Sequence, residues 1–284
     1  MAARTSRIRI GTNVLLLPLH DPLRVAEDAA TIGILSDGRF TLGVGLGYRP
    51  DEYAAFGRNL RYRPSLLEEA ITILRRAWSG EPVDFEGKRF RVPAVAIRPL
   101  PRQPVPLFLG GLSPAAVGRA GRLADGYLSI NGEFGAAYLD ALSEAGRNPA
   151  SGRISTLYNA VIDEDPERTW ATVGPHALHQ INVYVSWGSF GPDARPFDSP
   201  DDLIKAGMYR LWDADTAAAH FADLLGRGPQ YEDIQLWAQF PGEAVDSGSQ
   251  RIEYLVNYVA PRTAALLKRA GNAEAESVQH LFRE

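Results

Sequence analysis

Residues 104–130 read PVPLFLGGLSPAAVGRAGRLADGYLSI and contain two apolar runs separated by a short helical pattern. The run at 104–110 has the length and composition of a buried strand. Pro114 suits the first turn of a helix, and the following residues to Leu123 keep helical spacing. The run at 125–130 predicts the next strand. Two strands joined by a helix are the repeating unit of α/β folds with parallel sheets.

The same order of strand and helix recurs along the chain. Asp21 is a candidate cap for a helix that begins at Pro22. We expect strands at 7–17, 39–45, 104–110, 125–130, 154–162 and 233–240, and helices at 22–33, 64–79, 114–123, 138–144, 167–187, 213–225 and 251–269. Residues 189–200 predict a loop. Six strands separated by helices imply parallel pairing through right-handed crossovers, in either an open doubly wound sheet or a barrel.

Composition limits the class of protein. The 284 residues are 45% hydrophobic and 23% charged, which is typical of a soluble globular chain, and a single domain over 1–284 with a polar tail at 271–284 is expected. Thirty basic and thirty-four acidic side chains give a net charge of -4, so nucleic acid or an anionic membrane is not an expected partner. The absence of cysteine excludes disulfides and thiolate sites. No apolar run is long enough to span a bilayer, and we expect a cytoplasmic protein with a small-molecule substrate.

Glycines follow two of the expected strands. Gly43, Gly45 and Gly47 end the strand at 39–45, where they let the backbone approach a ligand or simply form a tight turn. Gly110, Gly111 and Ser113 are followed at once by a helix, and free N–H groups at a helix N-terminus form a phosphate site. The Ser113 hydroxyl either contacts that phosphate or serves as an ordinary helix cap.

Other catalytic signatures are absent. His176 and His179 lie three residues apart on an expected helix, but no acidic residue completes a metal motif, and no metal site is expected. The sequence also lacks the serine elbow of hydrolases and the phosphate loop of nucleotide-binding proteins.

Three stretches, taken in order, resemble the luciferase-like monooxygenase superfamily: ARTSRIRIGTNVLLLPLHDP at 3–22, LSDGRFTLGVGLGYRPDEYAAFG at 35–57 and PVPLFLGGLSPAAVGRAGRLADGYL at 104–128. A looser similarity continues to LWAQFPG at 236–242. The resemblance implies a TIM (β/α)8-type barrel that binds FMN, or the related deazaflavin coenzyme F-420, across the carboxyl ends of its strands.

The resemblance also implies roles for individual residues. Thr12 and Asn13 would lie under the cofactor ring, and a non-proline cis peptide bond would fall near Asn13 and Val14. On the substrate side, Tyr48, Arg49 and His176 are candidates to donate protons or hydrogen bonds, although ordinary polar roles would also explain them. The remaining cofactor contacts implied by the resemblance are Gly45, Leu46, Gly47, Gly110, Gly111, Ser113, Asp125 and Gly126.

Relatives with this pattern begin with about two further β/α units before the segment that matches the start of this chain. The resemblance therefore implies an N-terminally shortened barrel with about six parallel strands and an open sheet edge at residues 8–17. A late start site, a deliberate truncation and a naturally short protein that pairs its edges with another subunit are the three explanations. The last explanation would make the protein a homo-oligomer.

Two classes of function follow. The first is an enzyme. In one form, reduced FMN and oxygen oxygenate a small organic substrate, and a separate flavin reductase is a partner; in the other form, F-420 transfers hydride without oxygen. The second is a flavin-binding remnant of the family that performs no catalysis. Turnover in the presence of a reductant separates the two classes.

Overall fold

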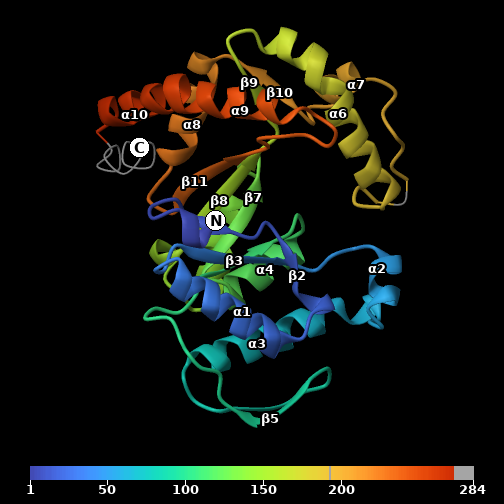
Figure 1. The fold of residues 1–284 in the computed structure, drawn as a ribbon, viewed down its shortest axis with the longest axis vertical. Helices are drawn as coiled ribbons and strands as arrows, with labels where there is room; N and C mark the ends of the chain where they lie inside the picture. Colours follow the sequence, from blue (N-terminus) through green and yellow to red (C-terminus); the bar gives the residue numbers. More distant parts are fainter. Residues whose placement is uncertain (192, 272–284) are drawn as a thin grey trace. The chain divides into compact units, whose positions relative to one another are not determined.

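The computed structural model describes residues 1–191 and 193–271, and these fall into two compact units (Figure 1). The first unit contains Met1–Ser129 and Phe134–Arg153, and the second contains Ile130–Glu133 and the described part of Ile154–Glu284. Each unit is built from parallel strands with helices, so the expected α/β class is confirmed. None of the helices within the described ranges is long and apolar enough to cross a membrane.

Parallel strands form the centre of the first unit. They are β1 (Ile10–Gly11), β2 (Leu15–Leu16), β3 (Phe40–Gly45), β6 (Leu107–Gly110) and β7 (Gly126–Ile130). Both β1 and β2 pair with β3, whose other edge pairs with β6, and β6 pairs with β7. The prediction of one continuous strand at 7–17 was wrong. The chain leaves the ladder between β1 and β2, where the Asn13–Val14 peptide bond is cis, as the family resemblance implied.

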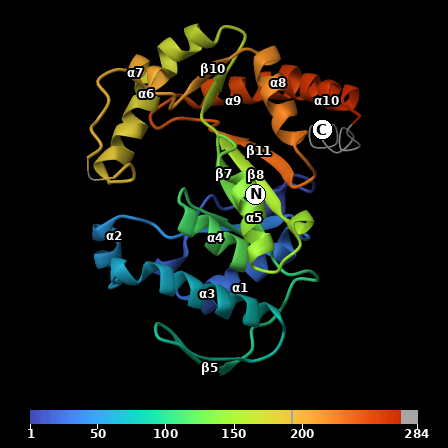
Figure 2. The same ribbon diagram turned by 180° about the vertical axis from the view of Figure 1, so that it is seen from behind.

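Helices pack in pairs in the first unit. Helix α1 (Pro22–Leu35) contacts α3 (Arg63–Trp78), and α4 (Pro114–Leu123) contacts α5 (Gly135–Glu144), as Figures 1 and 2 show. The Asp21 carboxylate accepts hydrogen bonds from the N–H groups of Leu23 and Arg24, which confirms the expected cap. The Trp78 indole N–H donates to the Ala26 carbonyl oxygen at 3.0 Å and ties α3 to α1.

Several short elements of the first unit have no counterpart in the expected pattern. They are α2 (Pro50–Ala55), the antiparallel strands β4 (Val83–Glu86) and β5 (Arg91–Val95), and the 3-10 helices η1 (Ala2–Arg4), η2 (Leu17–Leu19), η3 (Leu60–Tyr62) and η4 (Pro149–Ser151). The turn of the hairpin is held from outside. The Glu69 carboxylate on α3 accepts hydrogen bonds from the N–H groups of residues 88, 89 and 90.

The second unit contains two pairs of parallel strands. Strand β8 (Arg153–Tyr158) pairs with β11 (Tyr231–Leu236), and β9 (Ala160–Ile162) pairs with β10 (Arg210–Trp212). The expected strand at 154–162 is therefore interrupted at Asn159. The last expected strand, at 233–240, instead ends at Leu236, and a loop continues to Ala244.

Helices of the second unit are α6 (Pro166–Ser186), α7 (Pro200–Lys205), α8 (Ala214–Leu225), α9 (Val245–Tyr254) and α10 (Ala260–Arg269), with a π-helical segment, η5 (Leu255–Val259), between the last two. The helical interpretation of 167–187 is confirmed. The buried face of α6 includes Trp170, Val173, Ala177 and Ile181, which pack in one cluster with Tyr209. Of the expected tail, residues 272–284 lie outside the described part of the chain.

Candidate cofactor site

Three segments of the first unit meet around the side chain of Val14. A Cβ atom added to Gly45, at the end of β3, would lie 2.7 Å from Val14 Cγ2. A Cβ added to Gly110, at the end of β6, would lie 3.4 Å from Val14 Cγ1. The two glycines therefore leave room for Val14, whose side chain is still partly exposed. The carboxyl ends of β3 and β6 and the loop after β1 converge at this point.

The loop after β1 lies directly against β3. The Thr12 hydroxyl donates a hydrogen bond to the Gly43 carbonyl oxygen at 2.7 Å. A Cβ at Gly43 would lie 2.0 Å from the Thr12 carbonyl oxygen, which is far closer than any real contact. Gly43 is thus required for close packing of two backbones, and Thr12 is fixed by its own hydrogen bond next to the predicted ring position.

The loop after β3 is fixed by a buried tyrosine. The Tyr53 hydroxyl donates to the Leu46 carbonyl oxygen, and its ring lies next to Gly47. Burial raises the pKa of Tyr53 to about 12, so the hydroxyl keeps its proton and remains a donor. Gly47 has a φ of 71°, a conformation that favours glycine. Leu46 and Gly47 are therefore presented by a rigid turn.

The N-terminus of α4 forms a cradle for an anion. Ser113 caps the helix through the Ala116 N–H, at 3.3 Å, which is the ordinary role considered for it. Within the described residues, the N–H groups of Leu112, Ser113 and Ala115 donate no hydrogen bond. These free donors lie in the first turn of the helix, where they favour a phosphate.

Gly111 closes the cradle. A Cβ at this position would lie 2.5 Å from Ala116 Cβ, so a side chain would push the loop away from the helix. The Tyr127 hydroxyl donates to the Gly111 carbonyl oxygen at 2.6 Å and turns the loop. This arrangement fits the phosphate of a flavin or deazaflavin, because the space that a side chain would fill is left to backbone donors.

Asp125 and Gly126 are not at this edge of the sheet, which corrects their expected location. Gly126 pairs with Phe108, whereas Leu128 pairs with Gly110, so Asp125 precedes the amino-terminal end of β7. Its carboxylate accepts from the Leu107 N–H at 2.8 Å and forms an ion pair with Arg75 at 2.8 Å. The expectation that they contact the cofactor came from the family resemblance alone.

Gly126 has a packing role. A Cβ there would lie 2.4 Å from the Phe108 ring, so the glycine lets the ring lie flat on β7. Asp125 and Gly126 thus join neighbouring strands, away from the edge of the sheet where the phosphate cradle lies.

The candidates on the substrate side differ in their surroundings. Tyr48 follows the Gly47 turn directly, and 37% of its surface is exposed. Arg49 forms ion pairs with Asp51 and with Glu52, the latter at 3.5 Å, so its charge is already neutralised at the start of α2. Sequence reasoning missed Tyr53 and Tyr127, because no local pattern indicates that their hydroxyls bond to the carbonyl oxygens of Leu46 and Gly111.

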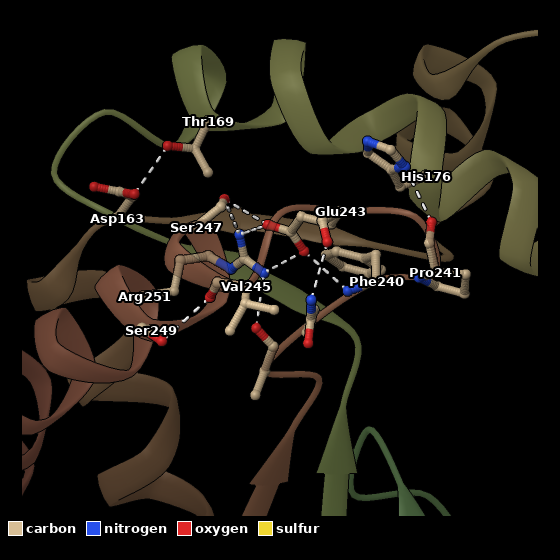
Figure 3. Close-up of polar contacts among 12 residues, drawn as sticks. Asp163, Thr169, His176, Phe240, Pro241, Glu243, Val245, Ser247, Ser249 and Arg251 are labelled. Atoms are coloured by element: carbon tan, nitrogen blue, oxygen red, sulfur yellow. Dashed lines mark hydrogen bonds and ion pairs between the residues drawn. The ribbon is translucent and has the colours of Figure 1, made fainter.

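His176 belongs to the second unit, on α6. Its Nδ1 atom lies 3.0 Å from the Pro241 carbonyl oxygen (Figure 3). A carbonyl oxygen only accepts, so Nδ1 donates in this contact. The hydrogen bond fixes the orientation of the imidazole ring on α6.

The loop that holds Pro241 is fixed by a buried ion pair, which Figure 3 also shows. Glu243 and Arg251 expose only 2% and 6% of their side chains. Burial acts to raise the pKa of Glu243, but hydrogen bonds from Arg251, Ser247 and the Phe240 N–H outweigh it and hold the pKa at about 2. The carboxylate is therefore charged at neutral pH and anchors the loop from Phe240 to Ala244.

Comparison with known proteins agrees with this geometry. The profile of the luciferase-like monooxygenase family matches residues 1–236. The chain belongs to that family. Curated relatives include the F-420-dependent glucose-6-phosphate dehydrogenase of Microbacterium testaceum, 33% identical over 204 residues, which are 65% of this chain and 60% of the relative. The enzyme of the same name from Mycolicibacterium fortuitum is 30% identical over 241 residues, 74% of this chain and 71% of the relative.

Solved structures of luciferase-like proteins share the fold. The monooxygenase RslO1 from Streptomyces bottropensis has a TM-score of 0.76 at 23% identity, covering 92% of this chain and 80% of its own. A coenzyme F-420-dependent tetrahydromethanopterin reductase from Methanopyrus kandleri has a TM-score of 0.68 at 20% identity, covering 92% and 85%. The luciferase-like chain described here spans about 60% of the length of the first curated relatives.

Proposed function

We propose that this chain is the cofactor-binding part of an F-420-dependent oxidoreductase. The observation that carries the proposal is the phosphate cradle at the N-terminus of α4, which follows the end of β6 where Gly110 lies against Val14. Similar curated relatives of the chain are named as F-420-dependent dehydrogenases. A bound deazaflavin would supply hydride transfer at its ring. The shared name of these relatives makes F-420 the first choice and FMN the second.

Residues of the chain would bind and orient the cofactor. The N–H groups of Leu112, Ser113 and Ala115 would hold the phosphate, and Val14 would lie against one face of the ring. The rigid turn at Leu46 and Gly47 would border the same cofactor. Thr12 and Asn13 remain predicted neighbours of the ring.

Two side chains are proposed to handle protons. Tyr48 follows the turn that borders the cofactor, and its phenol is a proton donor. The imidazole of His176 is oriented by the hydrogen bond from Nδ1 to the Pro241 carbonyl oxygen. Oxidation of an alcohol by a deazaflavin needs a base that takes the hydroxyl proton while the carbon bearing that hydroxyl gives up hydride to the cofactor, and His176 stays a sequence-based prediction for this base.

An FMN-dependent monooxygenase is the second candidate. It is favoured by the structural similarity to RslO1 and to a type II Baeyer-Villiger monooxygenase from Pseudomonas putida solved with FMN, with a TM-score of 0.70 at 19% identity, covering 92% of this chain and 81% of its own. This alternative needs oxygen and a separate reductase to supply reduced FMN.

The test is a fluorescence titration of the chain with F-420 and, separately, with FMN. The key variant is Ser113→Asp, because aspartate caps a helix as well as serine does while it adds a negative charge beside the phosphate. We expect at least about tenfold weaker binding of the cofactor, from charge repulsion at a few ångströms. The control is Asn148→Asp, which adds the same charge at the cap of η4.

Each outcome decides between the candidates. Tighter binding of F-420, lost in Ser113→Asp and kept in Asn148→Asp, supports the proposal, and hydride transfer from an alcohol or sugar phosphate then identifies an enzyme. Tighter binding of FMN with oxygen-dependent turnover supports the monooxygenase. Binding without turnover by either route supports a non-catalytic member of the family. A folded chain that binds neither cofactor contradicts all three.

A further inference from the structure

Three residues of the second unit directly follow the ends of neighbouring parallel strands. Asn131 follows β7, Asn159 follows β8 and Trp237 follows β11, and these strands are adjacent in the sheet. We call the three residues the strand-end row. In α/β sheets and barrels, ligands bind outside the carboxyl ends of the strands. The strand-end row therefore lies at the end of the sheet where a substrate is expected.

Backbone pairing and side-chain hydrogen bonds hold the row together. The register of β8 and β11 pairs Tyr158 with Leu236. Asn159 and Trp237, the next residues along each strand, are therefore side by side. The Trp237 indole N–H donates to Asn159 Oδ1 at 3.1 Å, and the backbone N–H of Asn159 donates to Asn131 Oδ1 at 3.4 Å. The row is thus one connected group of side chains.

These hydrogen bonds determine which way the two amides point. An indole N–H and a backbone N–H can only donate, so Asn131 and Asn159 each use Oδ1 as the acceptor. Each Nδ2 amino group is then a donor, and neither has a hydrogen-bond partner among residues 1–191 and 193–271. Both asparagines are half-buried and both amino nitrogens keep some exposure to solvent, so a ligand can reach them.

The row offers two donors beside an apolar ring and carries no charge. Part of Trp237 packs against the buried cluster on α6, and the side chain remains partly exposed. A phosphate or carboxylate would gain more from a cation, but the Arg227 guanidinium, which lies near Gly132, is already paired with Asp223 at 2.9 Å. Both Oδ1 atoms already accept hydrogen bonds, so the row suits an oxygen that needs no acceptor in return. A carbonyl oxygen has this property, whereas a hydroxyl group does not.

We propose that the strand-end row binds the carbonyl oxygen of an uncharged organic compound. The two amino groups of Asn131 and Asn159 donate to that oxygen, and the indole of Trp237 contacts the apolar part of the same molecule. The inference rests on the proposed function in one respect, since the oxidoreductase makes this compound its substrate or product. The row would then select an uncharged ketone over a phosphorylated sugar, which is the substrate in the name of the curated relatives.

The experiment follows the Trp237 indole resonance in NMR spectra of the isotope-labelled chain, assigned by its loss in Trp237→Phe. The probes are cyclohexanone, an uncharged ring ketone, and cyclohexanecarboxylate, an anion of similar size. The test variants are Asn159→Asp and Asn131→Asp. Each keeps the oxygen that accepts the existing hydrogen bond and replaces the amino donor by a second acceptor. The control is Asn257→Asp, which makes the same exchange at an exposed position of the second unit.

We expect cyclohexanone to shift the Trp237 resonance of the unaltered chain and of the control with equal affinity. Each test variant should bind cyclohexanone about tenfold more weakly, because a donor is lost and an acceptor faces the carbonyl oxygen. Thermal unfolding of the test variants should stay close to that of the control, because the hydrogen bonds within the row are kept. A purely structural role of the row would leave the affinity for the ketone unchanged.

Three results would overturn the inference: no response of Trp237 to cyclohexanone, tighter binding of cyclohexanecarboxylate than of cyclohexanone, or equal binding of the ketone by the folded test variants. The cofactor titration is a separate measurement. A chain that binds F-420 but not the ketone refutes the inference and leaves the proposed function standing. A chain that binds the ketone through the two asparagines but binds no cofactor refutes the proposed function and supports the row as a ketone site.

Discussion

Replacement of Glu243 by glutamine tests the ion pair that anchors the loop after β11. Glutamine has nearly the same shape as glutamate and can still accept the Phe240 N–H, but it has no charge. The Arg251 guanidinium, 6% exposed, would then be buried without a counter-charge. Removal of one partner from a buried pair destabilises a protein because the other partner remains desolvated.

The magnitude follows from the pKa of the carboxyl group. Folding lowers the pKa of Glu243 from its ordinary 4.5 to about 2, which corresponds to about 3 kcal/mol in favour of the charged form. Buried pairs broken on one side usually cost about 3–5 kcal/mol, in the same range. We therefore expect Glu243→Gln to lower the free energy of unfolding of the second unit by about 3 kcal/mol at pH 7.

The pH dependence has a definite sign. Because the folded pKa is the lower one, the charged carboxylate stabilises the fold fully above about pH 4.5, and this contribution is lost as the pH falls toward 2. The difference between the variant and the unaltered chain should therefore be constant from pH 6 to 8 and shrink below pH 4.5.

The assay is urea unfolding followed by tryptophan fluorescence. Four of the five tryptophans, Trp170, Trp187, Trp212 and Trp237, lie in the second unit, so the signal reports mainly on that unit. Glu253→Gln, at an exposed position of α9, is the control and should change stability little. A loss below about 1 kcal/mol in Glu243→Gln, or a loss that persists unchanged at pH 3, would refute this explanation.

Three further substitutions test the first unit. Gly43→Ala should lower the unfolding midpoint and weaken cofactor binding, because the new Cβ would lie 2.0 Å from the Thr12 carbonyl oxygen. The control is Gly118→Ala, whose new Cβ would lie no nearer than 3.8 Å to another atom; it should be neutral or stabilise α4 by up to about 1 kcal/mol. Asp125→Asn should cost about 1 kcal/mol of stability in thermal unfolding, because it weakens the ion pair with Arg75, and it should leave the cofactor Kd unchanged. A large change in Kd would show that Asp125 contributes to the cofactor site. Tyr53→Phe should raise the Kd severalfold with a loss of about 1 kcal/mol, and an unchanged Kd would show that the turn at residues 46–47 does not need its hydroxyl bond.

Elements with local signals were predictable from the sequence. Helix α4 begins and ends where expected, because a serine cap and a proline in the first turn define its start. The helix expected at 167–187 is confirmed, and the face formed by Trp170, Val173 and Ala177 is buried. In such elements the information lies within a few residues of the feature it determines.

Elements fixed by distant contacts were not predictable. The β4–β5 turn depends on Glu69, about twenty residues earlier, and the break between β1 and β2 falls inside a continuously apolar run. The position of Asp125 is a different case, because a residue that precedes a parallel strand lies at its amino-terminal end. Strand direction alone would have assigned Asp125 to that end.

The break in the first strand makes part of the site available for redesign. Ladder pairing with β3 is supplied by residues 10–11 and 15–16, so Asn13 and Val14 are not paired positions of the sheet. Substitutions in a paired strand usually disturb the neighbouring strand, whereas substitutions at these two positions would change the surface offered to the proposed cofactor without replacing a residue of the ladder. A library confined to residues 13 and 14, screened for binding of one cofactor over the other, would test whether these two positions set the choice of cofactor.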